Sequence, residues 1–207
     1  ATDVLHELSK HKSLGVVTVQ CEDEISGCAT AIGASFAGAL AVTTTSGPGV
    51  CLKSEAMNLA VITELPLVVL DVQRGGPSTG LPTKSEQTDL LQALFGRNGE
   101  SPMPVIAATS PTNCFDAAYA ACKIALEHMT PVVLLTDGFV ANGSGAWKLP
   151  NLDAYPEIKP QYVTPEMKDN YTPYKRNPEN QVRYWAVPGQ EGYTHILGGL
   201  EKDSNTG

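Results

Sequence analysis

The chain has 207 residues, 42% of them hydrophobic, which is enough for one globular domain of about 100 to 200 residues plus an additional segment. Its 22 acidic and 14 basic residues give a net charge of -8, which repels phosphate backbones and anionic membrane surfaces. The longest apolar stretches, such as 66–70 and 131–135, are far shorter than the roughly 20 residues of a membrane helix. We therefore expect neither nucleic acid nor a membrane as a partner.

The cysteines are odd in number and show no C-x-x-C spacing, so the sequence indicates neither a disulfide framework nor an iron–sulfur site. We interpret them as small buried thiols in a reducing cytoplasm. They are Cys21, Cys28, Cys51, Cys114 and Cys122. The four histidines are scattered, and their spacing indicates no metal site.

Helix-like and strand-like segments alternate over the first 140 residues, and the strands are continuously apolar, as is typical of a parallel sheet covered on both faces. In chain order we expect a helix at 2–11, a strand at 16–20, a helix at 24–37, a strand at 40–44, a helix at 50–64, a strand at 67–72, a helix at 85–95, a strand at 105–108, a helix at 113–129 and a strand at 132–136. This order predicts an α/β fold with a doubly wound parallel sheet and helices on both faces.

The C-terminal segment has a different composition. From Pro150 onward it holds seven of the 15 prolines and six of the seven tyrosines, with little periodicity of either kind. Proline disfavours both helices and central strands, so we expect a domain at 1–148 followed by an extended arm at 149–207. The many aromatic rings indicate that the arm lies on a surface, either its own or a partner's.

Three consecutive carboxylates, Glu22, Asp23 and Glu24, open the helix predicted from residue 24. Asp23 suits an N-cap, and acids in a first turn are favoured by about 0.3 to 1 kcal/mol each, so capping alone could explain all three. Positions 24, 27, 28, 31, 35 and 38, however, share one helical face and are small after Glu24. We therefore expect Glu24 to point into a packed contact and away from bulk water, where it needs a partner.

A second candidate site is the turn that follows the strand predicted at 40–44. Its glycines let the backbone come near a ligand at the carboxyl edge of the sheet, where α/β proteins bind small molecules, although such a turn can equally exist without a ligand. The turn consists of Ser46, Gly47, Pro48 and Gly49.

The loop after the strand at 67–72 has the G-x-x-x-x-G spacing of a P-loop at Gly75 and Gly80. It lacks the Lys and Ser/Thr that should follow, and Pro82 disfavours the helix that a P-loop requires. We therefore reject phosphate binding at this loop.

Three features of the sequence together resemble the pyrimidine-binding domain of thiamin diphosphate enzymes. The first is Glu24 followed nine residues later by Gly33, the second is the strand ending in TSGPG at 45–49, and the third is the strand LPLVVLDVQ at 65–73. The motif QRGGPSTGLPTKSEQTDL at 73–90 narrows the resemblance to the α subunit of 2-oxoacid:ferredoxin oxidoreductases, closest to the 2-oxoglutarate and branched-chain types. The resemblance covers residues 1–140 and includes VPGQEGYTHILGGLEKDSNTG at the end of the chain.

The resemblance implies roles for individual residues. Glu24 would hydrogen-bond the aminopyrimidine ring and favour its imino form, which activates the cofactor; a buried carboxyl suits this task because burial raises its pKa. The Ser46–Gly49 turn would contact the same cofactor. Arg74 would hold the substrate carboxylate, since a guanidinium matches a carboxylate bidentately. Lys84 and Gln87 are weaker candidates for polar contacts with the substrate.

The resemblance also implies a larger assembly. Thiamin diphosphate would be shared with a β subunit that carries the diphosphate site, Mg²⁺ and an iron–sulfur cluster, in a dimer of αβ units that acts on CoA and ferredoxin. We expect an N-terminal part of the domain and a following domain to lie outside this sequence. The implied reaction is oxidative decarboxylation of a 2-oxoacid to an acyl-CoA, with 2-oxoglutarate favoured. A branched-chain substrate, a non-catalytic scaffold subunit and a free-standing thiamin enzyme stay open as alternatives.

Overall fold

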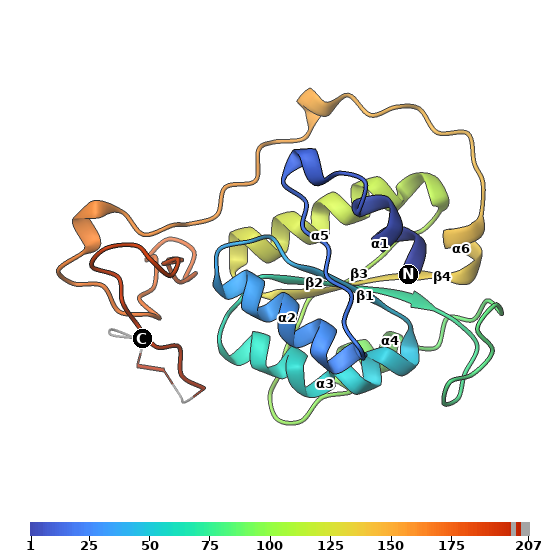
Figure 1. The fold of residues 1–207 in the computed structure, drawn as a ribbon, viewed down its shortest axis with the longest axis horizontal. Coiled ribbons are helices and arrows are strands. Elements are labelled where there is room, and N and C mark those ends of the chain that lie inside the picture. The colour runs from blue at the N-terminus through green and yellow to red at the C-terminus, as the bar shows by residue number, and fades with distance from the viewer. Residues whose placement is uncertain (200–201, 204–207) are drawn as a thin grey trace.

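The computed structural model describes residues 1–199 and 202–203 (Figure 1). Its sheet has four parallel strands in the order β1-β2-β4-β3. They are β1 (Val42–Thr45), β2 (Leu67–Gln73), β3 (Val105–Ala107) and β4 (Pro131–Asp137). All seven residues of β4 are buried, as the continuous apolar run predicts for a strand covered on both faces. The non-sequential strand order confirms the predicted α/β fold with crossover connections.

Helices cover both faces of the sheet (Figure 1). One core cluster joins α2 (Glu24–Phe36), α3 (Gly47–Ile62) and α4 (Leu90–Phe95) to one face of the sheet. A second cluster joins α5 (Cys114–His128) to the opposite face. The short helices α1 (Thr2–Leu8) and α6 (Gly138–Asn142) lie at the edges of this layer. No helix in the described part of the chain combines the length and the apolar character needed to cross a membrane.

Most predicted elements are present, but three expectations differ from the structure. The predicted strand at 16–20 is wrong: the segment pairs with no described strand, and Val17 and Val19 are 84% and 55% exposed. A β-prone sequence becomes a strand only where a neighbour accepts its hydrogen bonds. Helix α3 begins at Gly47 instead of residue 50, since Ser46 occupies the N-cap and Pro48 suits a first turn. Helix α4 begins only at Leu90, five residues later than expected.

The cysteines are all free thiols, but they are less uniformly buried than expected. Cys28 is fully buried, and burial raises its pKa to about 11. Cys51 is exposed, because it lies on the face of α3 that points away from the core. The expectation of five buried thiols is therefore wrong for Cys51, while the remaining three are partly buried.

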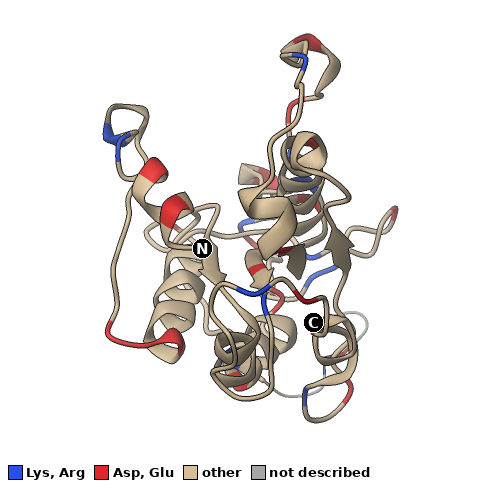
Figure 2. Cartoon of the chain, turned by 90° about the vertical axis from the view of Figure 1, so that its right-hand side faces the viewer, with Lys and Arg blue, Asp and Glu red and all other residues tan. Residues whose placement is uncertain are grey.

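Basic and acidic residues are distributed over several elements of the fold, as the blue and red segments of Figure 2 show. The net charge of -8 opposes the binding of a phosphate backbone.

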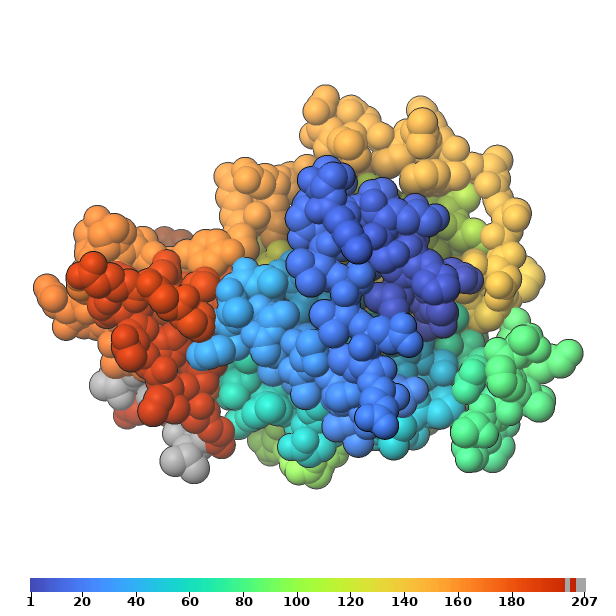
Figure 3. Space-filling model, in the orientation of Figure 1, coloured from blue at the N-terminus to red at the C-terminus, as the bar shows by residue number. Residues whose placement is uncertain are grey.

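The C-terminal arm runs over the α5 side and gathers at one end of the molecule, as the orange and red atoms of Figure 3 show. In the residues of the arm that the structure describes, the helical segments are short 3-10 turns at Leu152–Ala154 and Pro165–Met167. Its described part nevertheless has buried anchors: Val182 and Trp185 pack on Leu126 and Met129 of the domain. The sequence indicated that the arm lies either on its own domain or on a partner. These contacts show that its described part packs on its own domain.

Glu64 at the end of α3 is the polar anchor of the arm. Its carboxylate accepts two hydrogen bonds from Arg176, at 2.5 and 2.6 Å, and one from Lys202 at 2.8 Å. Its backbone carbonyl accepts a bond of 3.0 Å from the buried Arg183. Burial by itself would raise the pKa of Glu64, but the hydrogen bonds from Arg176 and Lys202 outweigh burial and lower it.

We expect Glu64→Gln to loosen the arm by about 1 to 3 kcal/mol, because it removes charge-assisted hydrogen bonds and leaves two cations unpaired. A carboxyl whose pKa is lowered by folding contributes stability above its usual pKa, and this contribution is lost as pH falls through the folded value. Wild-type protein should therefore expose the arm to protease in acid, and Glu64→Gln already at neutral pH. Glu179→Gln, an exposed site on the same arm, is the matched control. Equal protease resistance of both variants would contradict this role of Glu64.

Candidate functional site

The amino ends of α2 and α3 meet at the carboxyl edge of the sheet, because parallel register brings the ends of β1, β2 and β4 to the same side. Helix α2 starts with a capping box. The Ser26 N–H donates to Asp23 Oδ1 at 2.7 Å, and the Asp23 N–H donates back to Ser26 Oγ at 3.3 Å. Hydrogen bonds from Ser26 lower the pKa of Asp23. Asp23 is thus a cap, as the sequence predicts.

The small-residue face of α2 packs against α3. Cys28, Ala31 and Ser35 are buried there, as the helical spacing predicts. Glu24 heads this face but is exposed, so the expectation that this chain turns it away from solvent is wrong. It lies in the first turn, at the rim of the fold, where no other described residue donates a hydrogen bond to its carboxylate. The carboxylate is therefore free to bind another group.

Two glycines let this rim pack closely. A Cβ added at Gly49 would lie 1.9 Å from Thr45 Oγ1 and 2.8 Å from Glu24 Cγ. A Cβ added at Gly47 would lie 2.6 Å from both carboxylate oxygens of Asp89. The turn is consequently bracketed by two carboxylates, with Glu24 beside Gly49 and Asp89 beside Gly47.

A buried lysine lies beneath the same rim and was missed by the sequence reasoning. Lys53 is 2% exposed and donates a hydrogen bond of 2.6 Å to Thr43 Oγ1 in β1. Burial lowers the pKa of Lys53, while the nearby Cys28 and Glu24 oppose this shift. The sequence did contain a signal for this burial. Lys53 lies three residues from Val50 and four from Met57, both apolar, and this spacing places it on the core face of α3.

Arg74 follows β2 directly and is partly buried in its own loop. One guanidinium nitrogen donates to the Thr79 carbonyl at 3.0 Å, while Nε is buried without a partner among the described residues. The loop closes on itself through a 2.9 Å bond from the Gly75 N–H to the Lys84 carbonyl. Gly80 is required for this shape, because its φ is +58° and an added Cβ would lie 1.8 Å from the Gly75 carbonyl oxygen.

The two weaker candidates of this loop differ in environment. Lys84 is exposed and its ammonium group makes no hydrogen bond or ion pair with a described residue. Gln87 donates a 2.6 Å hydrogen bond to Asp137, whose other carboxylate oxygen caps α6. Burial would raise the pKa of Asp137, but the bonds from Gln87 and the capped N–H groups lower it. Gln87 thus ties the loop to the end of β4, a contact that the sequence did not predict.

The structure brings Glu24 and the Ser46–Gly49 turn into contact, and it places the loop of Arg74, Lys84 and Gln87 at the same edge of the sheet. No described hydrogen bond or ion pair joins Glu24 to Arg74. The candidate residues therefore form two separate groups, one at the turn and one in the loop.

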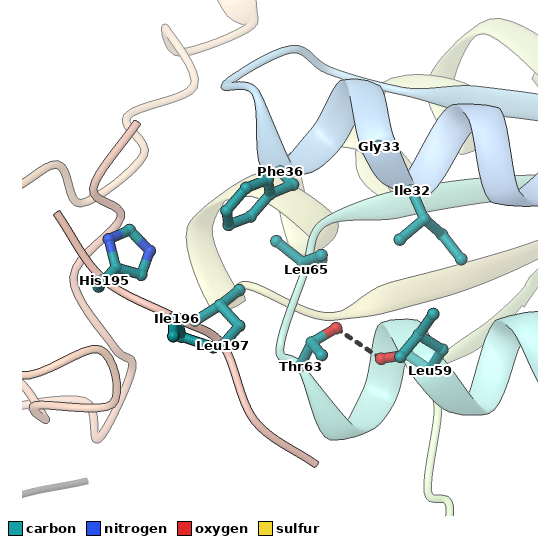
Figure 4. A pocket seen from close by; sticks show the side chains of 9 residues that line it. All are labelled: Ile32, Gly33, Phe36, Leu59, Thr63, Leu65, His195, Ile196 and Leu197. Atoms are coloured by element: carbon teal, nitrogen blue, oxygen red, sulfur yellow. Dashed lines mark hydrogen bonds between the residues drawn. The ribbon is translucent and has the colours of Figure 1, made fainter. Parts of the chain in front are cut away.

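An apolar cavity of about 410 Å³ lies elsewhere, at the amino edge of the sheet (Figure 4). It is bounded by the last turns of α2 and α3 and by the arm, where Phe36, Leu65 and Leu197 point toward one another. Because Glu24 and Gly49 lie in the first turns of the same helices, this cavity is separate from the candidate site.

Comparison with known proteins identifies relatives of the whole chain. Residues 1–205 match the family model described as pyruvate flavodoxin/ferredoxin oxidoreductase, thiamine diphosphate-binding. The chain is 56% identical over 207 residues to the 2-oxoglutarate oxidoreductase subunit KorA of Mycobacterium tuberculosis, covering 100% of this chain and 31% of that protein. It is 45% identical over 138 residues to the 2-oxoglutarate synthase subunit KorA of Archaeoglobus fulgidus, covering 67% and 40% respectively.

A solved structure is also similar. The 2-oxoglutarate:ferredoxin oxidoreductase of Magnetococcus marinus, with 2-oxoglutarate, coenzyme A and succinyl-CoA bound, superposes with a TM-score of 0.89 at 35% identity. The match covers 100% of this chain and 36% of that one. The matched regions thus make up 31% to 40% of the length of these relatives.

We expect Gly49→Ala to destabilise the chain by about 1 to 3 kcal/mol, because the new methyl group must displace Thr45 or Glu24 from a packed rim. The matched control is Gly33→Ala in α2, where an added Cβ meets nothing within 4 Å and should stabilise the helix by up to about 1 kcal/mol. Urea unfolding of both variants measures the difference. Equal stability of the two variants would show that the rim can accommodate a methyl group at position 49, and it would contradict the close packing of the rim.

Proposed function

Since this chain belongs to the thiamine diphosphate-binding family of pyruvate flavodoxin/ferredoxin oxidoreductases, we propose that it forms the pyrimidine half-site of a 2-oxoglutarate:ferredoxin oxidoreductase. The longer α subunit, with a β subunit, would convert 2-oxoglutarate and CoA to succinyl-CoA and CO₂ and pass two electrons to ferredoxin. The observation that carries this proposal is the exposed Glu24 carboxylate, whose side-chain stem packs beside Gly49 of the Ser46–Gly49 turn at the carboxyl edge of a parallel sheet.

The rim fits the pyrimidine end of the cofactor. The glycine turn brings α3 within contact of Glu24, and the carboxylate has no competing partner among the described residues. When bound, thiamin diphosphate supplies a carbon nucleophile that accepts the electrons of decarboxylation. Glu24 would hold a proton against the ring nitrogen of the pyrimidine. A partner subunit closing over the exposed residue would exclude water and strengthen this hydrogen bond.

Arg74 would bind the carboxylate of the 2-oxoacid. Its partly buried guanidinium is held by one bond to Thr79, which leaves several N–H donors for a ligand. The exposed Lys84 would meet a second negative charge, such as the distal carboxylate of 2-oxoglutarate. Gln87 would contact substrate only if it releases Asp137, so its first role is to hold the loop.

The rest of the assembly is proposed from the relatives. A β subunit would supply the diphosphate site with Mg²⁺ and the iron–sulfur cluster, and two αβ units would form a dimer in the cytoplasm. We also propose the division into a domain at 1–148 and an arm at 149–207. The names of the KorA relatives favour 2-oxoglutarate as substrate.

We expect Glu24→Gln in the reconstituted complex to lower kcat by about 10² to 10⁴, because an amide cannot hold the ring proton as a carboxylate does. Turnover is measured with 2-oxoglutarate, CoA and a viologen acceptor. Glu22→Gln, which changes the same charge two residues earlier, should leave kcat within about twofold. Proton exchange of the bound cofactor, followed by NMR, gives a readout that is independent of electron transfer.

The same assay separates the alternatives. Unchanged turnover of Glu24→Gln would favour a scaffold role for this subunit. Preference of the wild-type complex for 2-oxoisovalerate over 2-oxoglutarate would place it in the branched-chain type. Activity of the full-length α subunit without a β subunit would indicate a free-standing thiamin enzyme.

Arg74→Lys should raise KM for the 2-oxoacid by about 10- to 100-fold, since lysine keeps the charge but loses the bidentate fork. The KM for CoA, measured in the same preparation, is the internal control and should stay unchanged. A parallel rise in both values would indicate a general distortion of the loop and would argue against a contact with substrate.

A further inference from the structure

Two buried acids lie under the glycine turn, and neither belongs to the roles proposed above. Asp71 is in the middle of β2, opposite Thr45 of β1 and Leu135 of β4. It shares a face with the core residues Leu67 and Val69, and its side chain is fully buried. Among the described residues, neither of its carboxylate oxygens has a conventional hydrogen-bond donor. A buried, ionised carboxylate in this state would be very costly.

Asp89 is the neighbour that faces Asp71. It is 7% exposed, lies at the N-cap of α4, and its Oδ2 is also buried without a donor. Its position is fixed on two sides. Its N–H donates a 3.0 Å bond to the Gln73 side chain, and its carboxylate touches the backbone of Gly47 so closely that no Cβ would fit there.

Two adjacent buried carboxylates cannot both be ionised without a cation, because burial and mutual repulsion each favour the neutral form. Burial first, and then the charge and hydrogen bond of Asp89, raise the pKa of Asp71 to about 8. No basic group contributes to this shift: Lys53 is bonded to Thr43, and Arg74 is bonded to Thr79. One proton held between the two carboxyl groups pairs one oxygen of each and removes one of the two charges.

The pair closes the base of the candidate substrate loop. Asp71 lies three residues before Arg74 and Asp89 lies just after the loop ends, so a bond between them joins the two ends of that segment. Asp89 at the same time contacts Gly47 in the turn that brackets Glu24.

We propose that Asp71 and Asp89 are positioning residues that share one proton, and that this proton clamps the Arg74 loop against the Ser46–Gly49 turn. Loss of the proton would place two negative charges in contact and push the loop away from the turn. The catalytic consequence rests on the function proposed above, whereas the clamp itself is a property of the fold.

The test uses the full-length subunit in its complex. Infrared spectra of the wild type should show the carbonyl band of a protonated carboxyl at pH 7 that disappears as pH rises past about 8, and Asp71→Asn should lack it. A carboxyl whose pKa is raised by folding stabilises most at low pH, and this contribution is lost as pH rises through the folded value. Wild-type stability should therefore fall relative to Asp71→Asn between pH 4 and 8.

Kinetics supply the second readout. Asp71→Asn keeps a hydrogen bond to Asp89, so its kcat/KM for the 2-oxoacid should stay within about threefold of wild type at pH 7. Above pH about 8 the wild type should lose about tenfold per pH unit, and the variant should not. Asp89→Asn should behave in the same way, and the exposed Asp3→Asn should follow the wild type.

Three outcomes would overturn the clamp: absence of the infrared band in the wild type, parallel pH profiles of the wild type and Asp71→Asn, or stabilisation of the pair by an added divalent cation. The wild-type titration needs no variant, so it decides the question even if the substitutions fail to fold. If the complex does not turn over a 2-oxoacid but the band and the stability difference are present, the proposed function fails and the clamp stands.

Discussion

The close packing of α2 on α3 at the carboxyl edge of the sheet is the constraint on which the site depends. Only glycine at position 49 leaves space for Thr45 Oγ1 and for the stem of Glu24. The small residues that follow along α2 let the two helices stay in contact below this point. Because the contact fixes the first turns of both helices, it also fixes where Glu24 lies relative to the glycine turn.

Charge at this edge is distributed unevenly between surface and interior. Glu24 is exposed, and it opposes the lowering of the pKa of the nearby Lys53 that burial causes. On the other side of the turn, Asp71 and Asp89 are buried without a cation. The same turn therefore lies between an exposed carboxylate and a buried pair that shares a proton. The Glu24 side of the turn is thus open to solvent, whereas the Asp89 side is held by contacts within the chain.

The later part of the arm is anchored at the opposite end of the domain. Glu64 lies at the amino edge of the sheet. Its side chain accepts hydrogen bonds from Arg176 and Lys202, and its backbone carbonyl accepts one from Arg183. Trp185 adds an apolar anchor against the end of α5. These contacts lie at the amino edge, whereas Tyr155, near the start of the arm, packs on Phe115 in the first turn of α5.

The sequence by itself determined the elements that depend on local patterns. Continuous apolar runs located the central strands, Asp23 marked the start of α2, and the spacing of small residues identified its packed face. The TSGPG turn and the 73–90 motif identified the family. These features could be predicted because each depends on residues that are close along the chain.

Only the tertiary structure decided the features that depend on distant neighbours. The segment at 16–20 has strand-forming residues but no pairing strand among the described residues, and Glu24 is exposed because none of those residues covers it. The contact between Gln87 and Asp137 spans 50 residues, and the pairing of Asp71 with Asp89 depends on the return of a loop. Burial and electrostatics are set by what the fold places beside a group, and spacing along the sequence does not specify that neighbour.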